Sequence, residues 1–576
     1  MKNALLLACC LVSFLCSDAQ ICRWAKQSSG ESNNGVVAIA ATGGAGYVVE
    51  AGIYTGTQIT FGTDTLANPD STTFRTFLVK YANTGAVVWA RSYGGSKNTM
   101  ATDIATDNLG NVYLYGNYTD SILTFDGITL LNDSARRNLF LVKVNNTGSV
   151  VWAKNIHLHP RDTFVTNWAS KIAVNGGHVA ITGSFDNAIT FGTLSRTYSN
   201  PLGTAMFIAE YDTSGSALWA TNSLDTQPST YSDAGSDVAF DASGNIYVCG
   251  RMQGDSVAFS DTVYVNAPAP GSLGFFLVKY NSSGAAIWAA GENGTVAASA
   301  YPAAITTDIS GNVYMGGNFG HALTIGSTTL TNATTTGNTP DIFVASYSST
   351  GSPRWAKSFT GDTLTDYFGD MVADEWGRVF VSGVSQALPF AYDGHDFTES
   401  GMFMAALDNA TGNATWWWNA ATANGNRSFC TGMAHIPGDW SLYASGDFQQ
   451  SVSIDITDFS GTPTTTTLST PITVYQDAFL LNFQIMSGDD VKDIVNGGTP
   501  IKLYPNPATK EIMLSSDAEI ISYVVTDCRG EQVLGGEPAA REAEVNTANL
   551  APGLYFVTVK TKEGVVVEKF VKLISN

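Results

Sequence analysis

The chain has 576 residues, of which only 14% are charged, and it carries a formal net charge of −21. No basic cluster interrupts this acidic balance, which argues against a nucleic-acid or anionic-lipid partner. Beyond residue 19 the cysteines are Cys22, Cys249, Cys430 and Cys528. They are too scattered for a disulfide framework or for metal-ligand spacing, so we expect buried thiols.

The first 19 residues have the pattern of a secretory signal peptide. Lys2 supplies the positive start, residues 4–15 form an apolar run, and Ser17 and Ala19 are the small residues of a cleavage site. The apolar run is shorter than the roughly 20 residues that a membrane-spanning helix needs. We therefore expect residues 1–19 to be removed, and we expect no integral membrane segment elsewhere.

A phrase that begins with Phe and ends with Trp then returns six times. A glycine precedes the tryptophan by four residues in every copy, and Phe precedes it by 12 residues in five copies and by 13 in the last. The copies run from Phe77 to Trp89, Phe140 to Trp152, Phe207 to Trp219, Phe276 to Trp288, Phe343 to Trp355 and Phe403 to Trp416. A period of 60 to 70 residues indicates an array of supersecondary units.

Each unit also contains a turn followed by a short strand, most clearly at Asp107–Gly116, Asp241–Gly250 and Asp308–Gly317. The Asp-x-x-Gly-Asn core favours a tight turn, because Asp bonds to nearby backbone and Gly tolerates positive φ. Looser copies bring the number of units to seven, and they lie at residues 42–52, 175–183, 374–383 and 437–446. A Phe-x-x-x-x-Leu element between the second and third strands predicts a small hairpin. Four antiparallel strands per unit predict the blade of a β-propeller.

The two ends of the array complement each other. Residues 21–26 hold a Trp-Ala strand around Trp24 with no Phe strand before it, and residues 477–483 hold a Phe strand around Phe479 with no Trp-Ala strand after it. Placed in one blade, they complete a seventh unit and remove the sheet edges that an open array would expose. The sequence thus predicts an all-β, seven-bladed β-propeller over residues 20–485, with six or eight blades as alternatives. Its repeated structural tryptophans are Trp24, Trp89, Trp152, Trp219, Trp288, Trp355 and Trp416.

These phrases resemble the bacterial β-propeller repeats known as SBBP repeats, over residues 21–485. The resemblance lies in the Asp-x-x-Gly-Asn-x-Tyr turn, the Phe-Leu-Val-Lys-Tyr strand and the Gly-x-x-x-Trp-Ala segment. It implies the fold, and it carries no binding or catalytic residue with it.

The tail differs in composition from the array. Residues 486–499 are polar and are interpreted as a linker; from residue 500 Lys, Glu and Val become frequent and Trp is absent. Alternating strands bounded by Pro-Asn-Pro, Arg529-Gly530 and Pro552-Gly553 turns predict a small Ig-like β-sandwich over residues 500–576.

The order of motifs in the tail resembles the type A C-terminal sorting domain of the type IX secretion system. The matching residues are Tyr504, Pro505, Asn506, Pro507, Gly553, Tyr555, Lys569 and Lys572. The resemblance implies export across the outer membrane by the type IX machinery, followed by release or attachment to the cell surface. An ordinary Ig-like adhesion module is the alternative.

Two sets of residues are candidates for ligand binding. Acids of the first strands could line a central channel, and they include Asp103, Asp237, Asp366 and Asp370. Of these, Asp237 and Asp370 are the favoured candidates, and hydrogen bonding at turns and strand ends is the alternative. We expect no cofactor; calcium is the one cation that the acidity suggests, although no Asp-x-Asp-x-Asp-Gly loop is present.

The second set is the run Trp416-Trp417-Trp418. In an extended strand Trp416 and Trp418 share one face and Trp417 lies on the other. An exposed indole can stack on a sugar, so Trp417 and Trp418 are candidate ligand residues, with packing at a blade edge as the alternative. His157 and His159 would share a strand face but have no further zinc ligand at recognisable spacing.

No catalytic motif points to an enzyme. The chain lacks a Gly-x-Ser-x-Gly elbow, a P-loop, a dinucleotide fingerprint and a His-Glu-x-x-His sequence. The favoured function is therefore a secreted or surface-attached binding or scaffold protein that contacts a glycan or a surface protein. The alternatives are a structural surface component without a soluble ligand, and a polysaccharide-acting enzyme with carboxylates near the propeller axis.

Overall fold

The structure is a computed structural model in which the chain divides into two compact units, residues 1–485 and 486–576. It describes residues 21–484 and 501–572, apart from gaps at 31–32, 43–45, 133–136, 160–170, 201–202, 226–231, 268–271, 293–298, 333–338, 362–363, 387, 398, 422–427, 437–440, 458–462, 471–475, 507, 509, 528–531, 551–552 and 563–564. The predicted signal peptide and linker lie outside the described residues.

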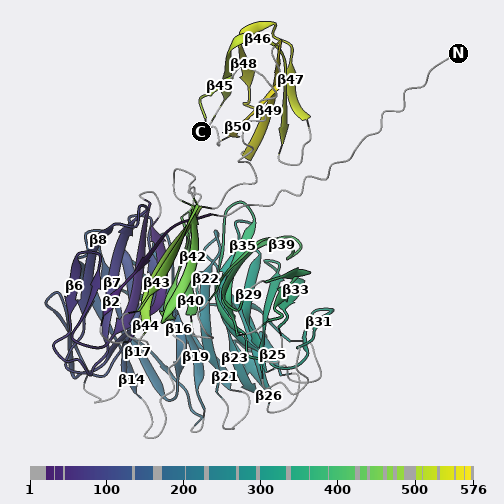
Figure 1. The fold of residues 1–576 in the computed structure, drawn as a ribbon. Helices are drawn as coiled ribbons and strands as arrows, with labels where there is room; N and C mark the ends of the chain where they lie inside the picture. Colours follow the sequence, from purple (N-terminus) through teal and green to yellow (C-terminus); the bar gives the residue numbers. More distant parts are fainter. Residues whose placement is uncertain are drawn as a thin grey trace. The chain divides into compact units, whose positions relative to one another are not determined.

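The first unit is built from four-stranded antiparallel sheets, as the repeats predict (Figure 1). Among the described residues, six of these sheets have four strands, and a seventh has six because a neighbouring hairpin joins its four; we number the seven four-strand sets as repeat sheets. Repeat sheet 1 contains β3 (Asn34–Thr42), β4 (Tyr47–Tyr54), β7 (Arg75–Ala82) and β8 (Val87–Tyr93). Repeat sheet 2 contains β9 (Thr99–Thr106), β10 (Val112–Tyr118), β13 (Asn138–Val144) and β14 (Val150–His159). Repeat sheet 3 contains β15 (Lys171–Asn175), β16 (His178–Phe185), β19 (Ala205–Asp212) and β20 (Ala217–Asn222). Repeat sheet 4 contains β22 (Ala234–Phe240), β23 (Ile246–Gly254), β26 (Ser272–Tyr280) and β27 (Ala286–Gly291). Repeat sheet 5 contains β28 (Tyr301–Thr307), β29 (Val313–Phe319), β32 (Asp341–Tyr347) and β33 (Pro353–Phe359). Repeat sheet 6 contains β34 (Tyr367–Ala373), β35 (Arg378–Ser385), β38 (Gly401–Asp408) and β39 (Ala414–Ala421).

Repeat sheet 7 combines both ends of the first unit. Its strands are β40 (Ser428–His435), β41 (Ser441–Gln449), β44 (Gln476–Gln484) and β1 (Ile21–Gln27). β1 pairs antiparallel with β44, from Ile21 opposite Gln484 to Gln27 opposite Phe479, so purple and green strands lie side by side in Figure 1. The first strands of the seven sheets also contact one another in series, from β3 through β9, β15, β22, β28 and β34 to β40, and β40 contacts β3.

Short hairpins join the second and third strands, as the Phe-x-x-x-x-Leu element predicts. They are β5 (Gln58–Phe61) with β6 (Asp64–Ala67), β11 (Ile122–Phe125) with β12 (Ile128–Leu131), β17 (Ala188–Phe191) with β18 (Leu194–Thr197), β24 (Ser256–Ala258) with β25 (Tyr264–Asn266), β30 (Leu323–Ile325) with β31 (Thr328–Leu330), β36 (Ala391–Tyr392) with β37 (His395–Asp396), and β42 (Ser451–Thr457) with β43 (Pro463–Ser469). Some hairpins extend the preceding sheet, because β17 pairs with β14, and Thr360, just after β33, bridges to Ala391. Two further short strands, β2 (Ser29–Gly30) and β21 (Leu224–Asp225), pair with β5 and β24.

The Asp-x-x-Gly-Asn-x-Tyr phrase is explained by the bonds of its aspartate. Asp241 Oδ1 accepts the backbone N–H groups of Ser243 and Asn245, both at 2.9 Å. Its Oδ2 accepts the Asn245 side-chain amide at 2.8 Å and the Tyr247 hydroxyl at 3.0 Å, and Lys279 Nζ lies 3.4 Å away. Asp107 and its neighbours repeat this pattern in sheet 2. One carboxylate thus fixes the turn, the second strand and the third strand together.

The tryptophan of each phrase links one sheet to the next. Its indole Nε1–H donates to a backbone carbonyl in the Gly turn of the following sheet. The pairs are Trp24 with Asn83 at 2.8 Å, Trp89 with Asn146 at 3.1 Å, Trp152 with Thr213 at 3.0 Å, Trp219 with Ser282 at 3.1 Å, Trp288 with Ser349 at 3.1 Å and Trp355 with Asn409 at 3.0 Å. In the sixth sheet Trp416 packs against Phe483 of β44, with ring centroids 6.2 Å apart.

The invariant glycine of the phrase lies under the preceding indole. The six turn glycines have φ of 71–87°, which side chains rarely adopt. A Cβ atom at any of them would come within 2.5–3.1 Å of the preceding tryptophan ring. The Gly-x-x-x-Trp phrase therefore specifies two different seams. Its glycine packs under the tryptophan of the preceding sheet, and its tryptophan packs over the turn glycine of the following sheet.

Hydrophobic side chains fill the space between neighbouring sheets. One cluster joins Leu78 and Trp89 of sheet 1 to Leu114 and Val142 of sheet 2. Such interdigitated apolar surfaces supply most of the favourable free energy of folding. Cys22, Cys249 and Cys430 are buried free thiols, as predicted, and Cys528 lies outside the described residues.

The second unit has its own core and is organised around one long strand. β46 (Glu511–Asp527) pairs with β45 (Ile501–Tyr504) and β48 (Ala540–Asn546) along its first half, and with β47 (Gln532–Gly536) and β49 (Gly553–Thr561) along its second half. β50 (Val565–Lys572) pairs with β49. The predicted strands are present, and β46 joins them into one six-stranded sheet that packs around a shared core.

The seam glycines make a stability prediction. We expect Gly351→Ala to lower the free energy of unfolding by about 1–3 kcal/mol more than Gly244→Ala, as overpacking does. Both residues have similar positive φ, 87° and 79°, but a Cβ at residue 351 would lie 2.8 Å from Trp288, whereas one at residue 244 meets nothing within 4 Å. Urea unfolding of the two variants measures the difference. Equal losses would show that the indole contact does not constrain the glycine.

Candidate functional site

Four ionisable residues of the first strands converge in the middle of the first unit. Asp103 is opposite Tyr115 on β10, Asp237 is opposite Cys249 on β23, and Lys171 is opposite Thr182 on β16. Asp370 lies at the bulge of β34, and its amide donates to Ser382 Oγ at 3.0 Å. They belong to repeat sheets 2, 3, 4 and 6, and we call these four residues the central cluster.

The carboxylates of the central cluster bridge consecutive sheets. Each accepts a backbone N–H from the first strand of the following sheet. The bonds are Ile172 to Asp103 at 2.9 Å, Ile305 to Asp237 at 2.8 Å and Met433 to Asp370 at 2.8 Å. The second oxygens of Asp237 and Asp370 accept the amides of Val238 and Met371, both at 2.8 Å. Strand-end hydrogen bonding, the alternative to ligand binding, thus occupies both oxygens of these two carboxylates.

The charges of the central cluster interact strongly. Burial raises the pKa of Asp237 to about 7 and that of Asp370 to about 6, against the lowering effect of Lys171. Burial also raises the pKa of Asp103, whose carboxylate lies 3.6 Å from Lys171 Nζ. Burial alone would lower the pKa of Lys171, but attraction to the three carboxylates raises it above its ordinary value. One ammonium therefore offsets part of the charge of three aspartates.

The other predicted acid and histidine positions lie apart from this cluster. Asp366 is buried just before β34, and its carboxylate accepts the Gln386 amide at 3.3 Å. The rings of His157 and His159 are stacked with centroids 6.4 Å apart. In the part of the chain that the structure describes, no group of three His, Cys, Asp or Glu side chains could hold a metal ion.

The three consecutive tryptophans divide as the strand alternation predicts. Trp418 packs against Phe483 with ring centroids 5.1 Å apart, on the same side as Trp416. Trp417 lies on the other side, is 39% exposed, and stacks on the His395 ring with centroids 3.9 Å apart and planes at 25°. His395 begins β37 directly after the turn residues Asp393 and Gly394. Trp417 and His395 thus form an exposed aromatic pair on one surface.

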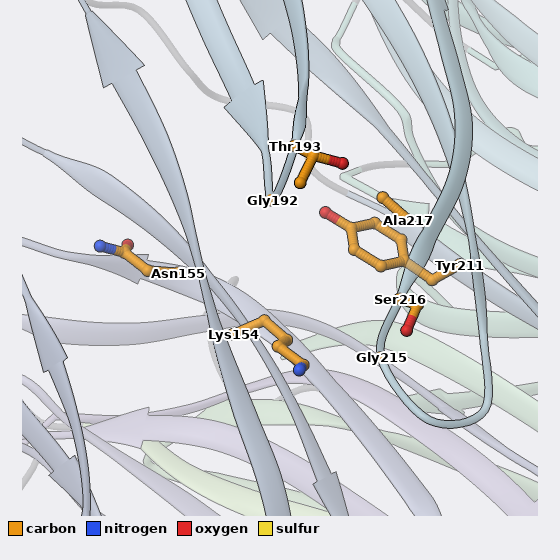
Figure 2. A pocket seen from close by; sticks show the side chains of 8 residues that line it. All are labelled: Lys154, Asn155, Gly192, Thr193, Tyr211, Gly215, Ser216 and Ala217. Carbon is orange, nitrogen blue, oxygen red and sulfur yellow. The ribbon is translucent and has the colours of Figure 1, made fainter.

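A pocket that the sequence reasoning missed lies between repeat sheets 2 and 3. It has a volume of about 350 Å³ and is lined by Lys154 and Asn155 of β14, the Gly192-Thr193 turn, Tyr211 of β19 and residues 215–217 (Figure 2). A second cavity of about 440 Å³ is lined by the first strands β15, β22 and β28 and the turns that follow β22 and β28. The available sequence signal for the first pocket is a combination: Lys154 stands two residues after the structural tryptophan, and the facing hairpin turn carries Gly192, where two other units carry Asp126 and Asp393.

The sorting-motif residues lie in the second unit. Tyr504 ends β45 and is half-exposed, and Tyr555 of β49 stacks on Phe570 of β50 with centroids 5.6 Å apart. Gly553 pairs with Lys572, and Phe556 pairs with Lys569, across β49 and β50. Pro505 and Asn506 follow Tyr504, and Pro507 lies outside the described residues.

Comparison with known proteins identifies the tail. A family model described as a secretion system C-terminal sorting domain matches residues 502–573. The chain ends in a sorting domain. This domain addresses its cargo to the type IX secretion machinery, and the exported cargo here is the β-propeller-like first unit. Within the described ranges there is no helix long and apolar enough to cross a bilayer.

The chain is similar to several proteins at low sequence identity. An uncharacterized WD repeat-containing protein, L264, of Acanthamoeba polyphaga mimivirus is 24% identical over 372 residues, which are 56% of this chain and 27% of the viral protein. The match therefore spans about a quarter of that relative. Chaetomium thermophilum Raptor has 8% identity with a TM-score of 0.41, covering 81% of this chain and 30% of Raptor. PorZ, a surface component of the type IX secretion system of Porphyromonas gingivalis, has 10% identity with a TM-score of 0.22, covering 93% of this chain and 81% of PorZ.

The central cluster predicts that stability falls as pH rises from about 4 to about 7. In this window the native carboxyl groups with raised pKa values bind more protons than the unfolded chain does, so rising pH favours unfolding. Glu50, Asp447 and Asp477 have pKa values that burial raises in the same direction.

We expect a higher urea midpoint at pH 5 than at pH 8, and a smaller difference in Asp237→Asn. The exposed Asp261→Asn serves as the matched control and should keep the full difference. An unchanged pH dependence in Asp237→Asn would contradict the assignment.

Proposed function

We propose that this protein is a secreted or cell-surface binding protein: a closed seven-bladed β-propeller of the SBBP type that contacts a glycan or a surface protein after type IX export. The observation that carries the binding role is the exposed Trp417–His395 pair. An indole held flat by a stacked neighbour presents its other face to a ligand at low entropic cost, and sugar rings pack on such faces.

Closure of the ring is supported by the pairing of β1 with β44 and by the contact of β40 with β3. Asn34 of β3 also donates to Asp477 of β44 at 3.0 Å, and Thr431 Oγ1 donates to the Val36 carbonyl at 3.2 Å. Residues more than 390 positions apart in the chain are thereby joined. A closed ring holds loops of distant units in fixed relative positions, which suits a binding scaffold.

The two alternative functions make different demands on the same residues. A polysaccharide-acting enzyme with carboxylates at the axis needs a pair of groups free to exchange protons with a substrate. The oxygens of Asp237 and Asp370 are already engaged by backbone amides of two sheets, which favours a bracing role. A structural surface component is compatible with the same geometry but leaves the exposed Trp417 without a role.

The binding role is tested with the mature chain on an array of glycans and matrix proteins. We expect a specific hit that Trp417→Ala weakens about tenfold, because the stacking face is lost. Trp376→Ala removes another half-exposed tryptophan, in the turn before β35, and should bind as the unchanged protein does. Repeating the assay with a chelator tests whether calcium contributes. A folded protein that binds nothing, or a hit indifferent to Trp417→Ala, would contradict the proposal.

A further inference from the structure

The pocket between repeat sheets 2 and 3 occupies a position that is filled in other seams. In the seam between sheets 5 and 6, Asp393 of the β36–β37 turn lies there. Its Oδ1 accepts Lys357 Nζ at 2.5 Å, and its Oδ2 accepts the Ala414 amide at 3.1 Å. In the seam between sheets 1 and 2, Asp126 of the β11–β12 turn accepts the Val150 amide at 3.0 Å. The protein itself thus places a carboxylate in this position twice.

The equivalent residues of the pocket can be assigned from the repeat. Lys154 follows Trp152 by two residues as Lys357 follows Trp355, and Ala217 holds the place of Ala414 and Val150. Gly192 holds the place of Asp393 and Asp126. All three turn residues have positive φ, 61°, 52° and 46° respectively. The pocket therefore lacks the carboxylate that Asp393 and Asp126 supply in their seams, and Gly62 and Gly326 show that Gly is the other residue used in this turn.

Loss of that carboxylate leaves polar groups without a protein partner. Among the described residues, Lys154 makes no hydrogen bond or ion pair; its Nζ lies 5.9 Å from the Trp152 ring centroid, and its side chain covers Gly215. The Tyr211 side chain is 2% exposed and its hydroxyl has no hydrogen-bond partner. Figure 2 shows this hydroxyl directed toward the Gly192-Thr193 turn, with Lys154 on the opposite side of the space. A buried unpaired hydroxyl has an energetic cost that a ligand would remove.

Other seams lack this combination. Tyr280 and Tyr347 hold the place of Tyr211 and also have unpartnered hydroxyls, but Thr221 and Ala290 replace the lysine in the sheets before them. Lys26 precedes a Gly turn as Lys154 does, but there Tyr81 donates its hydroxyl to Glu50 at 3.1 Å. An unpaired ammonium, an unpaired hydroxyl and a cavity occur together between sheets 2 and 3.

We propose that this pocket binds a uronic acid, with the sugar carboxylate at Lys154 and the Ala217 amide, where the Asp393 carboxylate lies in its own seam. Thr193 and Ser216 also line the pocket, and their hydroxyls suit the hydroxyls of a sugar ring. About 350 Å³ is within the range of small-ligand pockets and accommodates one sugar residue. The inference rests on the proposed role as a glycan-binding module, and it names a site separate from Trp417.

The test is calorimetric or NMR titration of the mature chain with glucuronate and galacturonate, alongside glucose and an N-acetylglutamate amide. We expect the uronates to bind, glucose to bind at least about tenfold more weakly, and Lys154→Gln to weaken uronate binding about tenfold or more. Lys26→Gln is the matched control and should have no effect. Equal uronate affinity in Lys154→Gln, or a preference for the glutamate derivative, would overturn the proposal.

A second variant closes the pocket with the protein's own chemistry. Gly192→Asp with Thr193→Gly transplants the Asp-Gly dipeptide of turns 126–127 and 393–394, in which both residues have positive φ. A Cβ at residue 192 meets nothing within 4 Å, so the fold should tolerate the change. We expect the double variant to unfold at or above the urea midpoint of the unchanged protein and to lose uronate binding. Retained binding would overturn the proposal.

The glycan array separates this inference from the proposed function. An array hit that depends on Trp417, combined with no uronate binding, overturns the pocket assignment and leaves the binding role intact. Uronate binding that depends on Lys154 supports the pocket assignment whatever Trp417→Ala does.

Discussion

The fold of the first unit depends on the contact between a tryptophan and the glycine turn of the next sheet. Six of the seven repeated indoles donate their N–H to a turn carbonyl and lie over a glycine that has no room for a side chain. A sheet with apolar faces must bury them against another element, so each sheet needs its neighbours. Because one phrase contains both the tryptophan and the glycine, every repeat specifies both of its seams. Each further copy of that phrase adds one sheet to the array. The first and last strands of the array must then pair with each other.

Much of this was visible in the sequence because the decisive contacts recur at fixed spacing. The Gly-x-x-x-Trp and Asp-x-x-Gly-Asn-x-Tyr phrases predicted the sheets, and the missing strands around Trp24 and Phe479 predicted the pairing of β1 with β44. The small hairpins followed from the spacing of Phe and Leu. Strand alternation also placed Trp417 opposite to Trp416 and Trp418.

The remaining features depend on residues that meet only after the sheets have assembled. The four residues of the central cluster lie in different repeats. No local sequence pattern predicts that Lys171 would offset part of the charge of Asp103, Asp237 and Asp370. The stacking of His395 on Trp417 requires a hairpin to fold back on the outer strand of its own sheet. The pocket at Lys154 depends on the absence of a carboxylate such as Asp393 from the facing turn, which is recognised only when the hairpin turns are compared in space. In the tail, the strands were predictable, but the single long β46 that joins them was not.

The contacts that recur from repeat to repeat stabilise the fold, and the side chains without a counterpart in the repeat are the candidates for ligand binding. Positions that obey the repeat hold neighbouring sheets together, whereas Trp417 stands where the other copies carry Ala, and Lys154 lacks the carboxylate partner that Lys357 has. An array of similar seams tolerates such departures because each seam contributes only a part of the total stability. The sorting domain then delivers this frame to the outside of the cell.

Hydrogen–deuterium exchange of the mature chain tests closure of this frame most directly. The account predicts that the amides of β1, residues 22–27, are protected as strongly as those of β44, and that both strands lose protection in one event as urea is added. Exchange of β1 within seconds, while β44 and the other sheets stay protected, would contradict closure and with it the role of the two chain ends in repeat sheet 7.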